Sequence, residues 1–488
     1  MTDDSIPHAR SSALGHRGWL VLITLCGATF MTGLDYSVVT VALPEIGRDL
    51  GFASAGSLQW VATACLLPTA GLLPLFGRVS DIVGRRLLFT SGVVLFGGFS
   101  LAAALAPGPA PLIAARAGQG ASAAMITPTA IALMTAAFPE GPRRTRALGV
   151  NGAVLSLGFV LGTLGGGVIT SGLNWRWTML LLAVISVLVL LGTTTLPRGA
   201  GTRAPARLDV PGAMLASIGL FALVYGISTG ADAGWASPPT LGSLFLALLS
   251  LSAFFLAERR HPAPLIPLGL LARPTVKWSG LVGLVTLGMC GGTTVLLSLY
   301  MQDVLGYSAL AAGTGFLAEG IAALMAGVLA ARLIAALGTA RAMSLGLAVQ
   351  GLGTGAMVLL PVKDGLLLVL ATSGAMGFGH VLTVVSFIAT MTSGLRDDEQ
   401  GTAGGLSQLP QFLGGIGTAA LAAIVTARTD ALSSTTDRAH ATLGGLHAAT
   451  LTAGLLCLAA GALPLLIRTT SLGPPGEASR SGTDLASR

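Results

Sequence analysis

Long apolar runs separated by short polar connectors make up most of the chain. A helix needs about 20 apolar residues to cross the hydrocarbon core of a bilayer, and each run approaches or exceeds that length. The sequence therefore predicts an all-α integral membrane protein with fourteen transmembrane helices. The predicted spans are 19–41, 57–77, 87–106, 110–135, 147–171, 177–196, 210–230, 240–257, 277–300, 309–332, 342–361, 365–392, 404–427 and 444–467.

The two longest internal polar connectors, 197–209 and 258–276, bracket the seventh and eighth runs. The predicted organisation is therefore six spans, an inserted pair and six more spans. Both tails are polar, and the last residues are rich in Pro, Gly and Ser, which is typical of disorder. The predicted units are a tail at 1–18, a helical bundle at 19–196, linkers with the inserted pair at 197–276, a second bundle at 277–468 and a disordered tail at 469–488.

The composition excludes a soluble globular protein. Mean hydropathy is +0.80 and only 10% of the residues are charged, whereas soluble domains carry about 25%. The 68 glycines suit close helix packing in a bilayer. The cysteines stand singly in apolar runs, so neither a disulfide framework nor a metal site is predicted. They are Cys26, Cys65, Cys290 and Cys457.

The net charge of +7 is spread over short loops, so a nucleic-acid partner is not predicted. With the N-terminus placed inside, 21 of the 27 Lys and Arg fall on the cytoplasmic side, five fall outside and one lies within a span. The positive-inside rule then predicts that both termini are cytoplasmic. The first run lacks a clean cleavage site and is predicted to be a span. The strong bias to Arg over Lys is typical of a GC-rich genome and indicates a bacterial protein, whose expected location is the cytoplasmic membrane.

Ionisable residues inside predicted spans are functional hypotheses, because they are costly in lipid. Asp35, Arg116, Glu319 and His380 lie within spans one, four, ten and twelve. A carboxylate in a low-dielectric cavity can exchange protons near neutral pH or pair with a cationic substrate. Asp35 is therefore a candidate site, with a structural role as the alternative. Glu319 is a second such carboxylate or a structural acid, and His380 is a proton site or a packed histidine.

The connector between the second and third spans combines an acid with two glycines and an Arg pair. Asp81 can accept hydrogen bonds from a helix N-terminus or from an Arg. Gly77 and Gly84 allow tight turns and close helix contact. With Arg85 and Arg86, these residues could form a cytoplasmic charge lock that opens as two bundles move. The alternative is a positive-inside loop with one counter-ion.

Several segments resemble motifs of the major facilitator superfamily. Gly77 to Arg86 resembles its motif A, and Leu34 to Pro44 resembles the first-span motif of its fourteen-helix drug:proton antiporter branch. Cys65 stands where that branch usually has Tyr. Motif B is matched by Leu112, Arg116, Gln119, Gly120 and Ala124, and further matches are Gln59–Val61, Asn174–Trp177 and Gln302–Ser308.

The fifth span resembles motif C, the antiporter motif, with one departure. Its glycines allow close helix packing. Thr163 replaces the motif's proline, so the helix keeps one more hydrogen bond and is expected to kink less. The missing proline puts antiport gating and coupling by this helix in question. The alternative is that these glycines serve only as a helix-packing face. The matching glycines are Gly158, Gly162, Gly166 and Gly167.

The resemblance implies the major facilitator fold of two six-helix bundles with two inserted helices. It implies proton-coupled export of hydrophobic, often cationic, drugs or metabolites by alternating access. Asp35 would be the substrate- or proton-linked carboxylate and Arg116 part of the proton relay. Asp81 and Arg85 would form the lock, with Arg143 or Arg144 as further partners.

Other functions remain open within transport. A dedicated exporter of one metabolite, such as an antibiotic or siderophore, is one alternative, and a uniporter or importer is another. The two lysines lack the context of an ATP-binding loop, so the proton gradient is the expected energy source and no cofactor is predicted. No catalytic constellation predicts an enzyme. The expected partners are a small hydrophobic substrate, protons and the lipid bilayer, and the chain is expected to be a monomer.

Overall fold

The structure is a computed structural model that describes residues 16–52, 55–196, 209–261, 266, 268–307, 309–395, 399–433 and 437–467. These residues form helices and connectors, with no strand among them. Fourteen helical segments in the described part of the chain are long and apolar enough to cross a membrane, which confirms the predicted fold class. Both predicted tails lie outside the described residues, apart from 16–18, as does most of the linker at 197–209.

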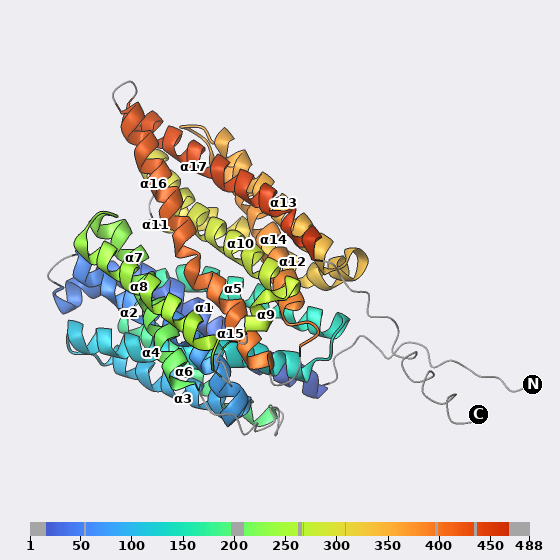
Figure 1. Ribbon diagram of the computed structural model, residues 1–488. Helices are drawn as coiled ribbons and strands as arrows, with labels where there is room; N and C mark the ends of the chain where they lie inside the picture. Colours follow the sequence, from blue (N-terminus) through green and yellow to red (C-terminus); the bar gives the residue numbers. More distant parts are fainter. Residues whose placement is uncertain are drawn as a thin grey trace, which may run out of the picture.

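The helices lie in two groups with an inserted pair between them in the sequence (Figure 1). In the first group, α1 packs on α5 while α2 and α3 pack on α4; in the second, α12 and α13 pack on α14 and α16 packs on α17. The first group is α1 (His16–Leu50), α2 (Ala55–Val83), α3 (Arg85–Ala104), α4 (Pro109–Ala137), α5 (Pro142–Gly172) and α6 (Arg176–Gly192). The inserted pair is α7 (Val210–Ala233) and α8 (Pro238–Glu258). The second group is α9 (Leu268–Ala272), α10 (Pro274–Leu299), α11 (Ala309–Gly315), α12 (Leu317–Leu337), α13 (Thr339–Ala356), α14 (Leu366–Met391), α15 (Gln400–Leu413), α16 (Gly415–Leu432) and α17 (Arg438–Ala460).

Two predicted spans remain single candidate membrane spans, but each consists of two helices that follow one another directly. The tenth span divides into α11 and α12 at Phe316. The thirteenth divides into α15 and α16 at Gly414, four residues after Pro410. A glycine lies at each place, Gly315 before Phe316 and Gly414 between α15 and α16, and glycine lowers the cost of leaving helical geometry. Apolar content alone carries no sign of either break.

Several helices extend beyond the predicted spans at their polar ends. Helix α1 begins at His16, inside the predicted tail, and continues to Leu50, while the candidate span within it, Gly18–Leu43, agrees with the predicted 19–41. The predicted linker at 258–276 contains the short helix α9. After α10, a π-helical turn at Tyr300–Val304 extends the ninth span. Helices continue past the lipid boundary because their backbone hydrogen bonds are made internally in water as well as in lipid.

The inserted helix α7 lies along α2. A Cβ added to Gly71 of α2 would lie 3.1 Å from the Ser217 carbonyl oxygen of α7. The rings of Trp60 and Tyr225 are 5.8 Å apart between the same two helices. The inserted pair is therefore fixed to the first bundle through α2, and α7 also contacts α16 of the second.

The two bundles are joined most closely at one end. We call it the basic end, where Arg85 and Arg86 lie in the first turn of α3, and Arg143 and Arg144 lie in the first turn of α5. Figure 1 shows the bundles side by side near α12 and α15 and further apart at the tips of α16 and α17. Helices α5 and α12 cross at two glycines, since a Cβ added to Gly327 would lie 2.5 Å from the Gly149 carbonyl oxygen.

Candidate functional site

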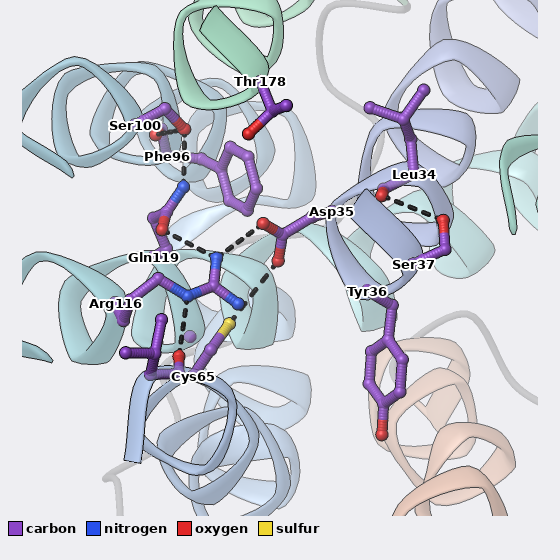
Figure 2. Close-up of polar contacts among 12 residues, drawn as sticks. Leu34, Asp35, Tyr36, Ser37, Cys65, Phe96, Ser100, Arg116, Gln119 and Thr178 are labelled. Atoms are coloured by element: carbon purple, nitrogen blue, oxygen red, sulfur yellow. Dashed lines mark hydrogen bonds and ion pairs between the residues drawn. The ribbon is translucent and has the colours of Figure 1, made fainter. Parts of the chain in front are cut away.

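A buried ion pair joins the two ionisable residues predicted in the first and fourth spans. Arg116 Nη1 lies 2.5 Å from Asp35 Oδ1, and the two side chains are 3% and 6% exposed. Arg116 Nε also donates to the Val61 carbonyl oxygen of α2 at 3.0 Å. Figure 2 shows the guanidinium between the Asp35 carboxylate and helix α2, so the pair ties α1, α2 and α4 together.

The pair continues into a hydrogen-bonded chain that reaches α3. Arg116 Nη1 donates to Gln119 Oε1 at 2.9 Å, and Gln119 Nε2 donates to Ser100 Oγ at 2.7 Å. On the other side, the Cys65 thiol donates to Asp35 Oδ2 at 3.7 Å. Buried charges are tolerated where further hydrogen bonds satisfy them. The network is thus a compensated polar centre inside the first bundle.

The motif C glycines position α1, the helix that carries Asp35. A Cβ added to Gly158 would lie 2.6 Å from the Phe30 carbonyl oxygen, and one added to Gly166 would lie 3.2 Å from Val38 Cα. An added Cβ on Gly162 would collide with Ser37 Oγ. Any larger side chain at these places would push α1 away. The position of Asp35 therefore depends on the small residues of α5.

The remaining motif C positions contribute less to this packing. Gly167 is in looser contact, since an added Cβ would lie 3.7 Å from a Val41 methyl carbon. Thr163 lies within α5, which is one helix from Pro142 to Gly172 with no internal proline. The environment of the Thr163 side chain lies outside what the structure describes.

The motif A residues connect the two bundles at the basic end. Asp81 Oδ1 pairs with Arg85 at 3.1 Å, and both side chains are buried. Asp81 Oδ2 accepts a hydrogen bond at 3.3 Å from the Thr402 backbone N–H, in the first turn of α15. Backbone N–H groups at a helix N-terminus favour a negative charge. Asp81 therefore joins an arginine of its own bundle to a helix of the other.

The glycines of motif A lie in two different backbone settings. Gly84 has φ +108° in the connection between α2 and α3, a conformation that side-chain-bearing residues rarely adopt. Gly77 lies within α2 and is in ordinary contact with α15, since a Cβ added to Gly405 would lie 3.7 Å from Gly77 Cα. Arg86 follows in the first turn of α3 and is half-buried.

A second contact across the basic end uses Arg144. Its Nη1 donates to the Thr392 carbonyl oxygen after α14 at 3.3 Å, and its Nη2 donates to the Thr135 carbonyl oxygen at 2.8 Å. Glu140 Oε1 pairs with Arg144 at 3.3 Å and accepts from the Gly394 backbone N–H at 2.9 Å. The basic end is thus closed by hydrogen bonds from α2, α5 and the connector between α4 and α5.

We expect Asp81→Asn to slow transport about tenfold. The amide is nearly the same size, but it removes the negative charge that Arg85 and the α15 N-terminus share, and hydrogen bonds to charged groups are worth about 1.5–3 kcal/mol. Transport rates in membrane vesicles check this, with Asp430→Asn, an exposed Asp at the opposite end, as the matched control. An unchanged rate for Asp81→Asn would show that the charge is not part of the gate.

The second bundle holds the other two predicted residues on separate helices. Glu319 lies near the start of α12, with Oε1 3.9 Å from the Cys290 thiol of α10. His380 of α14 lies with Nδ1 3.2 Å from the Thr286 hydroxyl, which donates to Gln350 at 2.6 Å. The structure therefore places Asp35 and Arg116 together, while Glu319 and His380 belong to other environments.

Three polar members of these networks, Ser100, Thr286 and Gln350, are not among the residues predicted from the sequence. All three are buried within spans. They are not ionisable, but an amide in an apolar run, such as Gln350, is an equally visible signal. No group of His, Cys, Asp and Glu in the described part of the chain could hold a metal ion.

The arrangement is suited to moving charge without covalent chemistry. Asp35 and Arg116 stabilise each other in the ionised form. Removing either charge would leave the other one buried without its counter-ion, which is costly.

Comparisons with known proteins agree with this architecture. The profile described as Major Facilitator Superfamily matches residues 25–419. The chain is 40% identical over 399 residues to the cephamycin export protein CmcT of Amycolatopsis lactamdurans, covering 81% of this chain and 82% of that protein. It is 42% identical over 320 residues to the puromycin resistance protein pur8 of Streptomyces alboniger, covering 65% of this chain and 63% of that protein.

A solved structure gives the same result for the fold. The human organic anion transporter MFSD10 (TETRAN) aligns with a TM-score of 0.61 at 18% identity, covering 91% of this chain and 98% of that chain. At this identity the likeness concerns the fold alone. Members of the major facilitator superfamily are transporters and not enzymes. From its helical architecture, its motif residues and the match over residues 25–419, this chain belongs to the major facilitator superfamily.

Proposed function

We propose that this protein exports hydrophobic small molecules across a bacterial cytoplasmic membrane in exchange for protons. The observation that carries the proposal is the buried Asp35–Arg116 pair at 2.5 Å inside the first bundle. An ion pair within a membrane protein's interior is expensive and marks ion or substrate pathways. Two similar proteins support the direction, since their names describe cephamycin export and puromycin resistance.

Alternating access would proceed by movement of the two bundles about the α5–α12 crossing. The positive-inside rule assigns the basic end to the cytoplasm. With Asp81 bonded to Thr402 and Arg144 bonded to Thr392, this end is closed. Breaking these bonds would open it to cytoplasmic or membrane-dissolved substrate. The cycle then needs a chemical signal that favours one arrangement over the other.

We assign that signal to the protonation of Asp35. Proton entry from outside would neutralise the carboxylate and weaken its hold on Arg116. Release on the cytoplasmic side would restore the pair and reset α1 against α4. The membrane potential contributes about 2.3 kcal/mol per charge for each 100 mV, which is enough to bias the cycle.

A narrower function, the export of one antibiotic-like metabolite, is supported by a specific observation. The similar proteins CmcT and pur8 are each named for a single antibiotic. A susceptibility panel on a strain lacking the gene, compared with the complemented strain, separates the two functions. A change confined to one chemical class supports the dedicated exporter, and changes across unrelated classes support multidrug export.

Asp35→Asn is expected to abolish proton-coupled transport while the protein still inserts. The amide cannot lose a proton at physiological pH, so the proposed switch is fixed in its neutral form. Uptake of ethidium from the medium into everted vesicles energised by a pH gradient provides the measurement, with substrate-induced decay of the gradient as the second readout. Asp430→Asn, exposed at the far end of α16, is the control.

Two outcomes would contradict this scheme. Transport by Asp35→Asn at the wild-type rate would remove Asp35 from the coupling mechanism. Wild-type transport that consumes no pH gradient for any substrate tested would remove antiport itself and favour a uniporter. Net uptake into cells would favour an importer.

A further inference from the structure

One side of α1 carries hydroxyl groups and is exposed in the middle of the span. Tyr36 is 47% exposed and Thr40 is also exposed, whereas the other residues from 33 to 39 are buried. Thr32 and Thr29 lie one and two turns before Tyr36 and are half-buried. Since a helix has about 3.6 residues per turn, these four residues share one side of α1. We call Thr29, Thr32, Tyr36 and Thr40 the hydroxyl face.

The hydroxyl face begins where the two bundles meet. The Thr29 hydroxyl donates to Asn151 Oδ1 of α5 at 2.7 Å. Asn151 lies between Gly149, where α5 crosses α12, and Gly152, where an added Cβ would lie 3.4 Å from a Val385 methyl carbon of α14. From Thr29 the face runs along α1 away from the basic end, toward the end at which the bundles are further apart (Figure 1). It is therefore directed at the space between the bundles.

Asp35 lies on a different side of the same helix. The Asp35 residue is 4% exposed, and its two oxygens contact Arg116 and the Cys65 thiol. Figure 2 shows the Tyr36 side chain pointing away from this network. A transported molecule cannot reach the carboxylate without breaking the network, whereas it can reach Tyr36 directly. Consecutive residues thus separate a closed ionic centre from an open surface.

Only one hydroxyl of this face has a proton to offer. The Thr32 hydroxyl donates to the Thr29 carbonyl oxygen at 2.9 Å, and the Thr40 hydroxyl donates to the Tyr36 carbonyl oxygen at 3.0 Å. Among the described residues, none forms a hydrogen bond with the Tyr36 hydroxyl. An unpaired phenol facing hydrocarbon is unfavourable, which favours an orientation toward water or substrate. The four side chains of the face are uncharged.

We propose that Tyr36 contacts the transported molecule directly and selects neutral, planar aromatic compounds that carry a hydrogen-bond acceptor. This inference rests on the proposed export function and names a substrate class for it. The ring supplies a large flat apolar contact, and the hydroxyl donates the one hydrogen bond left unused on this face. Thr32 and Thr40 extend the contact by one turn on either side. Because Asp35 and Tyr36 are consecutive, any shift of α1 that follows protonation moves the substrate contact as well.

The first test measures binding to the purified full-length protein in lipid nanodiscs, with retention by empty nanodiscs subtracted. The probes are xanthone and anthracene, two neutral planar tricyclic molecules of which only xanthone has acceptor oxygens. Tyr36→Phe should weaken xanthone binding about threefold to tenfold, the effect of one hydrogen bond, and leave anthracene binding unchanged. Tyr36→Ala should weaken both at least about tenfold, because it removes the ring. Phe245→Ala, which removes a ring 67% exposed on α8, is the control.

A second test establishes what the hydroxyl face is exposed to. In Thr40→Cys, a membrane-impermeant maleimide applied from the side opposite the basic end should label the new thiol, and xanthone should slow the labelling. The matched control is Phe245→Cys on α8, a helix that packs mainly against α7 and should resist the reagent because its exposed side faces lipid. The native cysteines are buried, so the wild-type protein gives the background.

Four results would overturn the inference. Xanthone affinity unchanged in both Tyr36 variants would remove the contact, and equal losses of the two probes in Tyr36→Phe would indicate a structural role. A wild-type protein that retains no xanthone beyond empty nanodiscs would remove the substrate class. Labelling of Thr40→Cys no faster than that of Phe245→Cys would place the face in lipid. The vesicle assay tests export separately, so a failure of export would appear there with Tyr36-dependent xanthone binding intact.

Discussion

Arg116→Ala is expected to abolish transport and to lower the free energy of unfolding by about 3–5 kcal/mol. The reason is geometric, since Arg116 Nη1 contacts both Asp35 and Gln119 while its Nε holds the Val61 carbonyl. Truncation to alanine removes these bonds together and leaves the Asp35 carboxylate, on a side chain 6% exposed, without its counter-ion. Breaking a buried pair by removing one partner costs far more than the pair itself contributes.

Thermal and denaturant unfolding in detergent, together with vesicle transport, measure the two effects. Arg259→Ala, at the exposed end of α8, is the matched control and should unfold as wild type does. The double variant Asp35→Asn/Arg116→Gln removes both charges and keeps groups able to hydrogen bond. It should recover part of the lost stability but none of the proton coupling. An Arg116→Ala protein as stable as wild type would mean that the pair does not hold the bundle together.

Gly149→Leu is expected to stop the basic end from closing and to reduce transport by at least about tenfold. At the α5–α12 crossing a Cβ added to Gly149 would collide with the Gly327 carbonyl oxygen, and one added to Gly327 would lie 2.6 Å from the Ala153 Cβ. The collision involves backbone atoms, so no side-chain rotation relieves it. Overpacking of this kind costs about 1–3 kcal/mol, which shifts a two-state equilibrium by about tenfold to a hundredfold.

A reporter cysteine makes this effect visible. Ala389 of α14 is 9% exposed and lines a cavity at the basic end together with Arg144 of α5 and Ile334 of α12. In an Ala389→Cys background, Gly149→Leu should increase labelling by a membrane-impermeant maleimide applied from the basic side. The native cysteines are buried, so the protein without Ala389→Cys gives the background.

The chain offers a matched control on the same helix. A Cβ added to Gly165 of α5 meets nothing within 4 Å. Gly165→Leu therefore introduces the same side chain and the same change in helix propensity without a collision. In the Ala389→Cys background, Gly165→Leu should be labelled to the same extent, and should transport at the same rate, as the Ala389→Cys protein alone. Equal labelling of Gly149→Leu and Gly165→Leu would show that the crossing does not govern closure.

Asp35 and Glu319 differ in their neighbours and not in their chemistry. In the sequence both are single acids within apolar spans. The tertiary structure gives Asp35 a guanidinium at 2.5 Å and gives Glu319 a glycine and a thiol. The resemblance to motif B marked Arg116 as a proton-relay residue. Only the packing of α1 against α4 identifies the acid on which it acts.

The motif residues show the same division. The loop from Gly77 to Arg86 predicts a charge lock, and Asp81 meets both kinds of partner expected for it, an arginine and a helix N-terminus. That helix, α15, lies more than 300 residues away in the sequence, so no local pattern predicts it as the partner of Asp81. Similarly, the motif C glycines predict close packing, but only the structure shows that the packed helix is α1.

The sequence by itself determined the membrane class, the fourteen spans and the family. Each of these depends on the local composition of a run of residues or on a short motif, and the cost of exposing polar groups to lipid acts on every span separately. The tertiary structure alone decided which buried acid has a counter-ion, where spans ten and thirteen break, and where α5 and α12 cross. These features depend on side chains that meet across helices, and the distance between helices is set by packing that no single span encodes.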